Sequence, residues 1–284
     1  MSRLVGFLKV VLVLIVDFLC IYNLLQDVEA TLLIVVGIAI YIFFGGYIAL
    51  LREGAVKSKK LPAYQKSRLD AVKARLVNDI KSACGADISS LKLYLVPGDD
   101  EMNASAYGCR CVSVTQGTFN TADPITLTAV LGHECSHILH FDAEFNRAVF
   151  CTVMILVSAL GIISFATVAI IFLIFLLLSC FRSWLGFMAF RGITKIVRTI
   201  FSFFQLGIVV VYQLLLGVIS RHSEYRSDRF SCQLGYGIQL AHFLALSEPS
   251  NQRQLTLSEA MYRTHPPTPK RIARLEAYVH RTQA

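Results

Sequence analysis

The sequence contains no nucleic-acid-binding pattern, although its formal net charge at pH 7 is +8. No stretch combines aromatic with basic residues in the manner of an RNA-binding strand, and no helix-turn-helix pattern occurs. We therefore exclude nucleic acid as a partner. The positive charge is better explained by contact with an anionic membrane surface.

The sequence also lacks the cysteine spacing of a disulfide-rich domain or a zinc ribbon. Of its eight cysteines, Cys20, Cys151 and Cys180 lie in or beside apolar segments. Cys109 and Cys111 are two positions apart, which does not make a C-x-x-C motif. We expect all the cysteines to be reduced and mostly structural thiols.

Apolar residues are abundant, and they are concentrated in a few segments. They make up 55% of the 284 residues, and the mean hydropathy is +0.58, whereas an ordinary soluble domain is about 45–50% apolar. A helix needs ~20 apolar residues to cross a bilayer, and four segments reach that length: 4–25, 30–51, 145–181 and 200–219. The first is longer than a signal-peptide core and no small-x-small cleavage site follows it, so we expect it to remain as an anchor.

One segment, 128–142, carries a metal-binding pattern. His133, Glu134 and His137 form an H-E-x-x-H motif. On an α-helix, residues four apart lie on one face, so both imidazoles can bind one metal ion. The Glu134 carboxylate follows the first histidine and can reach a water molecule at that ion, as in zinc peptidases. The motif therefore predicts a zinc site with Glu134 as the general base.

The third ligand has to come from elsewhere, because a catalytic zinc ion usually has three protein ligands. His140 lies a helical turn past His137 and is more typical of a surface histidine, and Glu144 is too close in sequence to fold back easily. Glu224 directly follows the fourth apolar segment, and Asp228 lies four residues on, on the same helix face. This pair suits a ligand carboxylate beside an acceptor for an imidazole N–H, which makes Glu224 the preferred third ligand.

Four ordered motifs resemble the HtpX family of membrane zinc metallopeptidases, and the resemblance extends over nearly the whole chain. The motifs are His133 to His137 with Asp142, Ser220 to Glu224 with Asp228, Thr264 to Pro267 with Lys270 to Ile272, and Asn103, Ala104, Ala106 and Gly108 before the metal-binding helix.

The resemblance implies that His133, His137 and Glu224 bind one zinc ion per chain and that Glu134 acts as the general base. We expect Asp142 and Asp228 to lie behind the ligands and to support them. The resemblance also implies a catalytic domain in the cytoplasm, at the inner membrane if the chain is bacterial, and a role in the stress-related quality control of membrane proteins.

Three features depart from the family's pattern without removing a ligand: Cys135 between the two histidines, Cys109 and Cys111 after the strand, and the basic segment 182–198. They bear on substrate and regulation. The related CaaX prenyl proteases share the motifs but are longer and have more spans, so the processing of prenylated proteins is an alternative. A non-catalytic, zinc-stabilised membrane chaperone is another, in which cysteines would close the metal site.

The predicted fold class is an α-rich membrane protein with four transmembrane helices and a small α+β, zincin-like metallopeptidase domain. An amphipathic helix is expected at 62–84, and strands are expected at 91–96 and 111–115. A further strand near 103–108 would flank the cleft, either as an edge to which an extended peptide adds or as a plain sheet edge. We divide the chain into an N-terminal transmembrane hairpin, a first catalytic part, a second hairpin and a second catalytic part, at 1–51, 52–147, 148–219 and 220–284.

Basic residues predict the orientation in the membrane. Arg52, Lys57, Lys59, Lys60, Lys66 and Arg68 follow the second apolar segment. Under the positive-inside tendency, this cluster places the catalytic part in the cytoplasm. Segment 182–198 is also basic and would then lie on the far side. We accept that conflict because the residues before and after the second hairpin must meet at one metal, and we expect 182–198 to be an amphipathic interfacial helix or a tolerated loop.

His265 is a further candidate residue. The oxyanion formed in peptide hydrolysis needs a donor besides the metal. His265 is predicted to be that donor or a gating ligand, or else a packing residue before the Pro266–Pro267 bend. The expected partners are the lipid bilayer and unfolded or membrane-protein substrates, and no oligomeric state is predicted.

Overall fold

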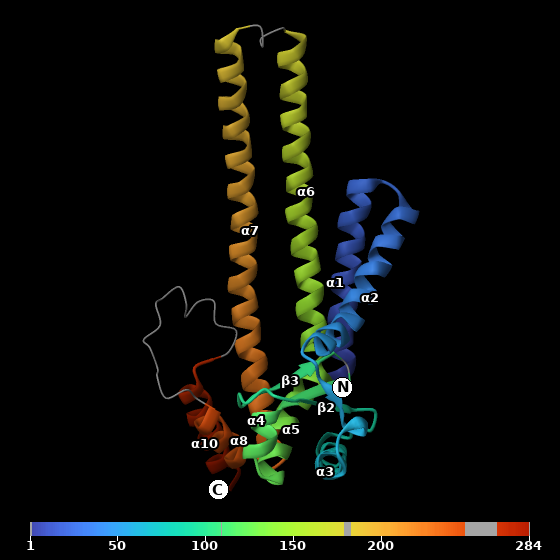
Figure 1. The fold of residues 1–284 in the computed structure, drawn as a ribbon, viewed down its shortest axis with the longest axis vertical. Coiled ribbons are helices and arrows are strands. Elements are labelled where there is room, and N and C mark those ends of the chain that lie inside the picture. Colours follow the sequence, from blue (N-terminus) through green and yellow to red (C-terminus); the bar gives the residue numbers. More distant parts are fainter. Residues whose placement is uncertain (1, 109, 179–182, 248–265, 284) are drawn as a thin grey trace.

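The computed structural model describes residues 2–108, 110–178, 183–247 and 266–283. Within them, four helices are long and apolar enough to cross a membrane, which confirms the predicted fold class. They form two hairpins that rise from the same side of a small mixed domain (Figure 1). The four helices are α1 (Ser2–Leu25), α2 (Val28–Arg52), α6 (Asp142–Leu177) and α7 (Trp184–Gln233).

The fourth apolar helix is longer than the sequence pattern indicates. Residues 184–198 do not form a separate interfacial helix or a loop, because they continue α7 without interruption. The helix starts where the Ser183 hydroxyl accepts a hydrogen bond from the backbone N–H of Gly186, and no proline interrupts it afterwards. Charge breaks the apolar run here, but it does not break the helix.

The mixed domain contains a four-stranded sheet with the order β1-β2-β4-β3. β2 and β4 are parallel, whereas β1 and β3 are antiparallel to their neighbours. β3 is therefore an edge strand among the described residues. The strands are β1 (Val56–Lys57), β2 (Lys92–Val96), β3 (Ala104–Tyr107) and β4 (Cys111–Thr115).

Helices cover this sheet and form one core with it. Leu76 of α3, Val114 of β4 and Leu127 of α5 have no exposed surface and belong to the same cluster. The remaining helices are η1 (Ser58–Lys60), α3 (Ala63–Cys84), α4 (Gln116–Thr121), α5 (Pro124–His140), α8 (Gly237–Ser247) and α10 (Thr268–Gln283). The predicted helix at 62–84 and the strands at 91–96, 103–108 and 111–115 are thereby confirmed, with small shifts at their ends.

The start of α5 is determined by residues just before the metal-binding motif. Asp123 caps the helix, since its carboxylate accepts hydrogen bonds from the backbone N–H groups of Ile125 and Thr126, and Pro124 occupies the first helical position, where a missing N–H costs nothing.

A single residue then joins α5 to α6. Phe141 adopts a left-handed conformation with φ of 57° and ends α5, and α6 begins at the next residue. The helix with the H-E-x-x-H motif is thus connected directly to a membrane helix.

The first hairpin approaches α5 closely through a glycine. A Cβ atom at Gly6 of α1 would lie 2.4 Å from the carbonyl oxygen of His140, a distance that no larger residue tolerates. Beside this contact, the rings of Phe7 and Phe141 meet edge to face with centroids 6.0 Å apart. The first hairpin and the mixed domain are therefore packed against each other next to the H-E-x-x-H motif.

Candidate metal centre

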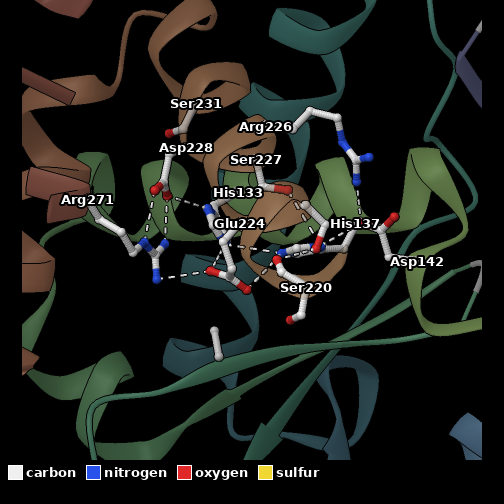
Figure 2. A network of polar contacts seen from close by, with 12 residues as sticks. His133, His137, Asp142, Ser220, Glu224, Arg226, Ser227, Asp228, Ser231 and Arg271 are labelled. Atoms are coloured by element: carbon white, nitrogen blue, oxygen red, sulfur yellow. Dashed lines mark hydrogen bonds and ion pairs between the residues drawn. The ribbon is translucent and has the colours of Figure 1, made fainter. Parts of the chain in front are cut away.

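Three side chains from α5 and α7 converge on one point (Figure 2). The Nε2 atoms of His133 and His137 lie 3.2 Å apart. The carboxylate of Glu224 lies 3.5 Å from Nε2 of His133 and 3.7 Å from Nε2 of His137. Glu224 comes from α7, which passes beside α5, so the predicted meeting of these distant segments is present.

Both imidazoles are oriented through their other ring nitrogen. Nδ1 of His133 lies 3.0 Å from Oδ1 of Asp228, and Nδ1 of His137 lies 2.8 Å from Oδ2 of Asp142. Because a carboxylate only accepts hydrogen bonds, each neutral imidazole must carry its proton on Nδ1. Each Nε2 atom then presents a lone pair to the other and to the Glu224 carboxylate.

This arrangement fits a metal ion by its donor chemistry. Two nitrogen lone pairs and a carboxylate oxygen that face one point repel each other unless a cation lies between them. Two imidazoles and one carboxylate are also the donor set of a catalytic zinc site. The second nitrogen of each ring faces a carboxylate, as such ligands require: His137 hydrogen-bonds Asp142, and His133 lies in ion-pair contact with Asp228. His133, His137 and Glu224 can therefore hold a metal ion.

Two arginines hold the supporting carboxylates from outside. Arg271 of α10 donates to Asp228 from Nε at 2.9 Å and from Nη2 at 2.6 Å, and its Nη1 lies 3.0 Å from Oε2 of Glu224. On the other side, Arg226 donates to Oδ2 of Asp142. Each imidazole thus contacts an aspartate through Nδ1, and that aspartate in turn contacts an arginine.

No pattern in the sequence predicts that these two arginines contact the supporting carboxylates. In the sequence, Arg226 looks like a charge at the membrane end of α7, and its pairing with Asp142 is visible only in the structure. Arg271 belongs to one of the recognised motifs, but nothing in its position indicates contact with Glu224. These contacts join residues 84, 47 and 43 positions apart, and no helical or strand periodicity extends over such separations.

The buried charges perturb the protonation of the metal-free site. Burial lowers the pKa of His133, but the hydrogen bonds and charges of Asp228 and Glu224 outweigh it and raise the pKa to about 10. A bound proton would occupy Nε2, the atom that a metal requires. A metal ion and this proton therefore compete for one position.

Glu134 lies at the wall of a cleft beside the triad. The cleft has a volume of about 320 Å³ and separates Glu134, His137 and Glu224 from the edge strand β3. Burial raises the pKa of the half-buried Glu134 carboxyl above its ordinary value, which makes the carboxylate a stronger base.

The cleft brings most of the predicted strand residues to the triad. Asn103, Ala104 and Ala106 line it, whereas Gly108 is not among its lining residues and forms the left-handed turn after β3, with φ of 70°. His265 lies outside the described residues.

The two weaker candidates for the third ligand are occupied elsewhere. Nδ1 of His140 hydrogen-bonds the carbonyl oxygen of Ser136 at 2.7 Å. Glu144 is fully buried and lies 3.5 Å from a guanidinium nitrogen of Arg147. Neither side chain is part of the triad.

The chain is similar to known peptidases. A family model described as Peptidase family M48 matches residues 65–279. Proteins named Protease HtpX homolog from Tropheryma whipplei strains Twist and TW08/27 are each 29% identical over 257 residues, which is 82% of this chain and 79% of theirs. The crystal structure of S. mikatae Ste24p covers 92% of this chain at 18% identity with a TM-score of 0.48, and this chain spans 61% of that protein's chain. The family match includes the triad and both supporting aspartate–arginine pairs.

Proposed function

Since this chain belongs to peptidase family M48, we propose that it is a membrane-bound zinc endopeptidase in which His133, His137 and Glu224 hold one zinc ion and Glu134 is the general base. The observation that carries the proposal is the convergence of two Nε2 atoms and one carboxylate beside Glu134 at a cleft. Zinc in such a set polarises a carbonyl group and makes water more acidic.

The aspartates behind the imidazoles and the general base have different roles. Asp228 and Asp142 keep the two imidazole protons on Nδ1, so that both Nε2 atoms are free to bind. Glu134 accepts a proton from the attacking water and passes a proton to the leaving amine, as its raised pKa favours. His265 remains the predicted donor to the oxyanion or gating ligand.

The edge strand supports the binding of extended peptides. The backbone N–H of Thr115 donates to the carbonyl of Asn103 at 3.1 Å, and in an antiparallel ladder the bonded pairs alternate. Ala104 and Ala106 therefore direct their backbone groups away from β4. The Ala104 N–H is taken by the side chain of Asn103, so among the described residues Ala106 is the one whose outward N–H and carbonyl are open to a substrate strand.

The position of the site supports membrane-protein substrates. Glu224 lies five residues beyond Ile219, the last residue of the apolar run in α7, which is roughly 7–8 Å along the helix. Juxtamembrane or unfolded segments of membrane proteins reach this depth. We infer a quality-control role at the cytoplasmic face, an orientation that the basic cluster from Arg52 to Arg68 favours. In a variant without the native cysteines, a membrane-impermeant thiol label that reaches Lys59→Cys only after the cells are opened would support this orientation.

The decisive experiment is Glu134→Gln. This variant should bind one zinc ion per chain, as the wild type does, and should lose cleavage of an unfolded membrane-protein substrate and of itself. Glu276→Gln, at an exposed carboxylate of α10, is the matched control and should keep both properties. Retained cleavage in Glu134→Gln, or a wild type without zinc, would contradict the proposal.

The rival function, a closed structural zinc site, requires additional ligands. Cys135 is fully buried in the core of the mixed domain rather than at the triad. In the part of the chain that the structure describes, no cysteine joins His133, His137 and Glu224. The triad keeps an open side toward the cleft, as a catalytic site requires.

A further inference from the structure

A second pocket lies between α7 and α10. Its volume is about 500 Å³, within the range of about 300–1,000 Å³ that is typical of small-molecule sites. Four arginines line it: Arg226, Arg229, Arg274 and Arg281. Of the four, only Arg226 has a role at the proposed metal site, where it supports Asp142.

The pocket has almost no negative charge of its own. Asp228 is the only carboxylate among the described lining residues, and its oxygens are already engaged by His133 and Arg271. Arg226 is paired with Asp142. The other three arginines are exposed and make no ion pair within the described residues.

Two tyrosines orient these arginines across the seam between the helices. The guanidinium of Arg274 lies 3.8 Å from the ring centroid of Tyr225, and that of Arg229 lies 5.4 Å from the ring centroid of Tyr278. From the first contact to the second, the residue numbers rise on both α7 and α10, so the two helices run in the same direction and Arg274 lies at the level of Tyr225. Stacked guanidinium groups are held in place with their donors available, which suits a phosphate group.

The depth of the pocket selects the source of that phosphate. His222 and Tyr225 are its first lining residues on α7, three and six positions past Ile219. For a helix along the bilayer normal, they lie roughly 4–9 Å beyond the hydrocarbon. The headgroup layer of one leaflet is about 5–8 Å thick. His222 is therefore at headgroup depth, Arg274 at the level of Tyr225 lies at the outer edge of this layer, and Arg229, ten positions past Ile219, lies roughly 15 Å along the helix, beyond it.

The geometry points to a binding site for the phosphate headgroup of an anionic lipid between α7 and α10. A bound headgroup neutralises like charges from two helices that otherwise repel. It thereby holds α10 against α7, and α10 carries Arg271, which contacts Glu224 and Asp228. The site lies outside the peptidase cleft, and lipid binding does not depend on the proposed catalytic function.

Lipid binding is best measured on the Glu134→Gln protein, so that peptide cleavage has no influence. Phosphatidylglycerol is titrated into neutral detergent micelles that contain the protein, and phosphatidylcholine and inorganic phosphate are titrated in parallel. We expect one saturable site for phosphatidylglycerol and at least tenfold weaker binding of the other two. Arg229→Gln with Arg274→Gln should weaken phosphatidylglycerol binding at least tenfold.

The matched control is Lys59→Gln with Lys60→Gln, which removes the same charge from exposed positions outside the pocket. It should change the affinity less than twofold. Equal losses in the two double variants would show diffuse surface attraction, and tight binding of inorganic phosphate alone would show a soluble anion. Either result, or the absence of a saturable site, overturns the inference.

A second measurement tests whether the bound headgroup holds α10 against α7. In the wild type, phosphatidylglycerol should raise the melting temperature and the cleavage rate relative to phosphatidylcholine, and in the arginine double variant both increases should disappear. If lipid binds but neither increase occurs, the stabilisation of α10 is wrong. If the melting temperature rises in a protein that cleaves nothing, the lipid site is supported and the peptidase proposal fails.

Discussion

Oδ1 of Asp228 lies 3.0 Å from Nδ1 of His133, and the same carboxylate receives two hydrogen bonds from Arg271. This aspartate is only 3% exposed, so it acts in a region where water does not weaken its charge. The imidazole is therefore held in one orientation, with its Nδ1 proton directed at Asp228, before any metal arrives. The first prediction concerns this contact.

Asp228→Asn should weaken zinc binding by about 10- to 100-fold, the usual cost of losing such a partner of a ligand histidine. The neutral amide leaves the Nδ1 proton less firmly held. Competition with a chromogenic chelator measures the change. Asp100→Asn, at an exposed carboxylate outside the cleft, should bind zinc as the wild type does, and unchanged affinity in Asp228→Asn would disprove the role.

Arg271→Met should destabilise the metal-free protein strongly. Its guanidinium is the charge partner of Glu224 and Asp228, both less than 5% exposed. Removing one partner of a buried ionic group costs on the order of 3–5 kcal/mol. Arg271→Lys should recover part of the loss, because it keeps the charge without the two-pronged geometry.

Unfolding midpoints of the metal-free proteins in one detergent test this prediction. Lys270→Met removes the neighbouring exposed charge on α10 and serves as the control. We expect its midpoint to stay close to that of the wild type. Equal midpoints for Arg271→Met and Lys270→Met would mean that the buried cluster does not need this arginine.

Ala106→Pro tests the edge strand. It removes the backbone N–H that points away from β4, and the ladder to β4 does not use that group. A lost hydrogen bond of about 0.5–1.5 kcal/mol corresponds to a KM that is roughly 2- to 12-fold higher for an unfolded substrate. Steady-state kinetics at full zinc occupancy provides the measurement.

Ala104→Pro is the matched comparison for the edge strand, since its N–H already bonds the Asn103 side chain at 2.8 Å. It should raise KM less than Ala106→Pro does. If both variants cleave like the wild type, β3 is a plain sheet edge and substrates bind elsewhere.

The sequence allows the centre of the site to be predicted, because local periodicity encodes it. His133 and His137 are one turn apart, and so are Glu224 and Asp228, and each pair shares a helix face. Arg226 and Arg271 could not be assigned, because their partners lie on other helices and tertiary packing alone selects them.

For the membrane helices too, the sequence predicts some features and not others. Four apolar segments predict four helices, and their number and approximate positions are confirmed. The start of α7 was misplaced, because basic residues such as Arg191 and Lys195 end an apolar run without ending a helix. Strand β1 was not predicted, since two residues, Val56 and Lys57, carry no alternation and pair only through β2.

His140 provides a prediction about pH. It lies at the junction of α5, α1, α6 and α7, and burial lowers its pKa below the ordinary value. The charges of Arg226 and Lys9 act in the same direction, whereas the Ser136 carbonyl and Asp142 partly oppose them. The imidazole is therefore neutral in the folded protein at a pH where it is already protonated in the unfolded chain.

The sign of the effect follows from this difference. Above pH ~6.5, both states are neutral and the contribution to stability is complete. As the pH falls below that value, the unfolded chain binds the proton first, so the wild type loses stability with a slope of at most about 1.4 kcal/mol per pH unit. His140→Asn can keep the hydrogen bond to the Ser136 carbonyl and has no proton to bind. Between pH 7.5 and 5.5, the unfolding midpoint of the zinc-loaded wild type should therefore fall relative to that of the zinc-loaded variant, whereas a constant difference would place the acid sensitivity in other groups.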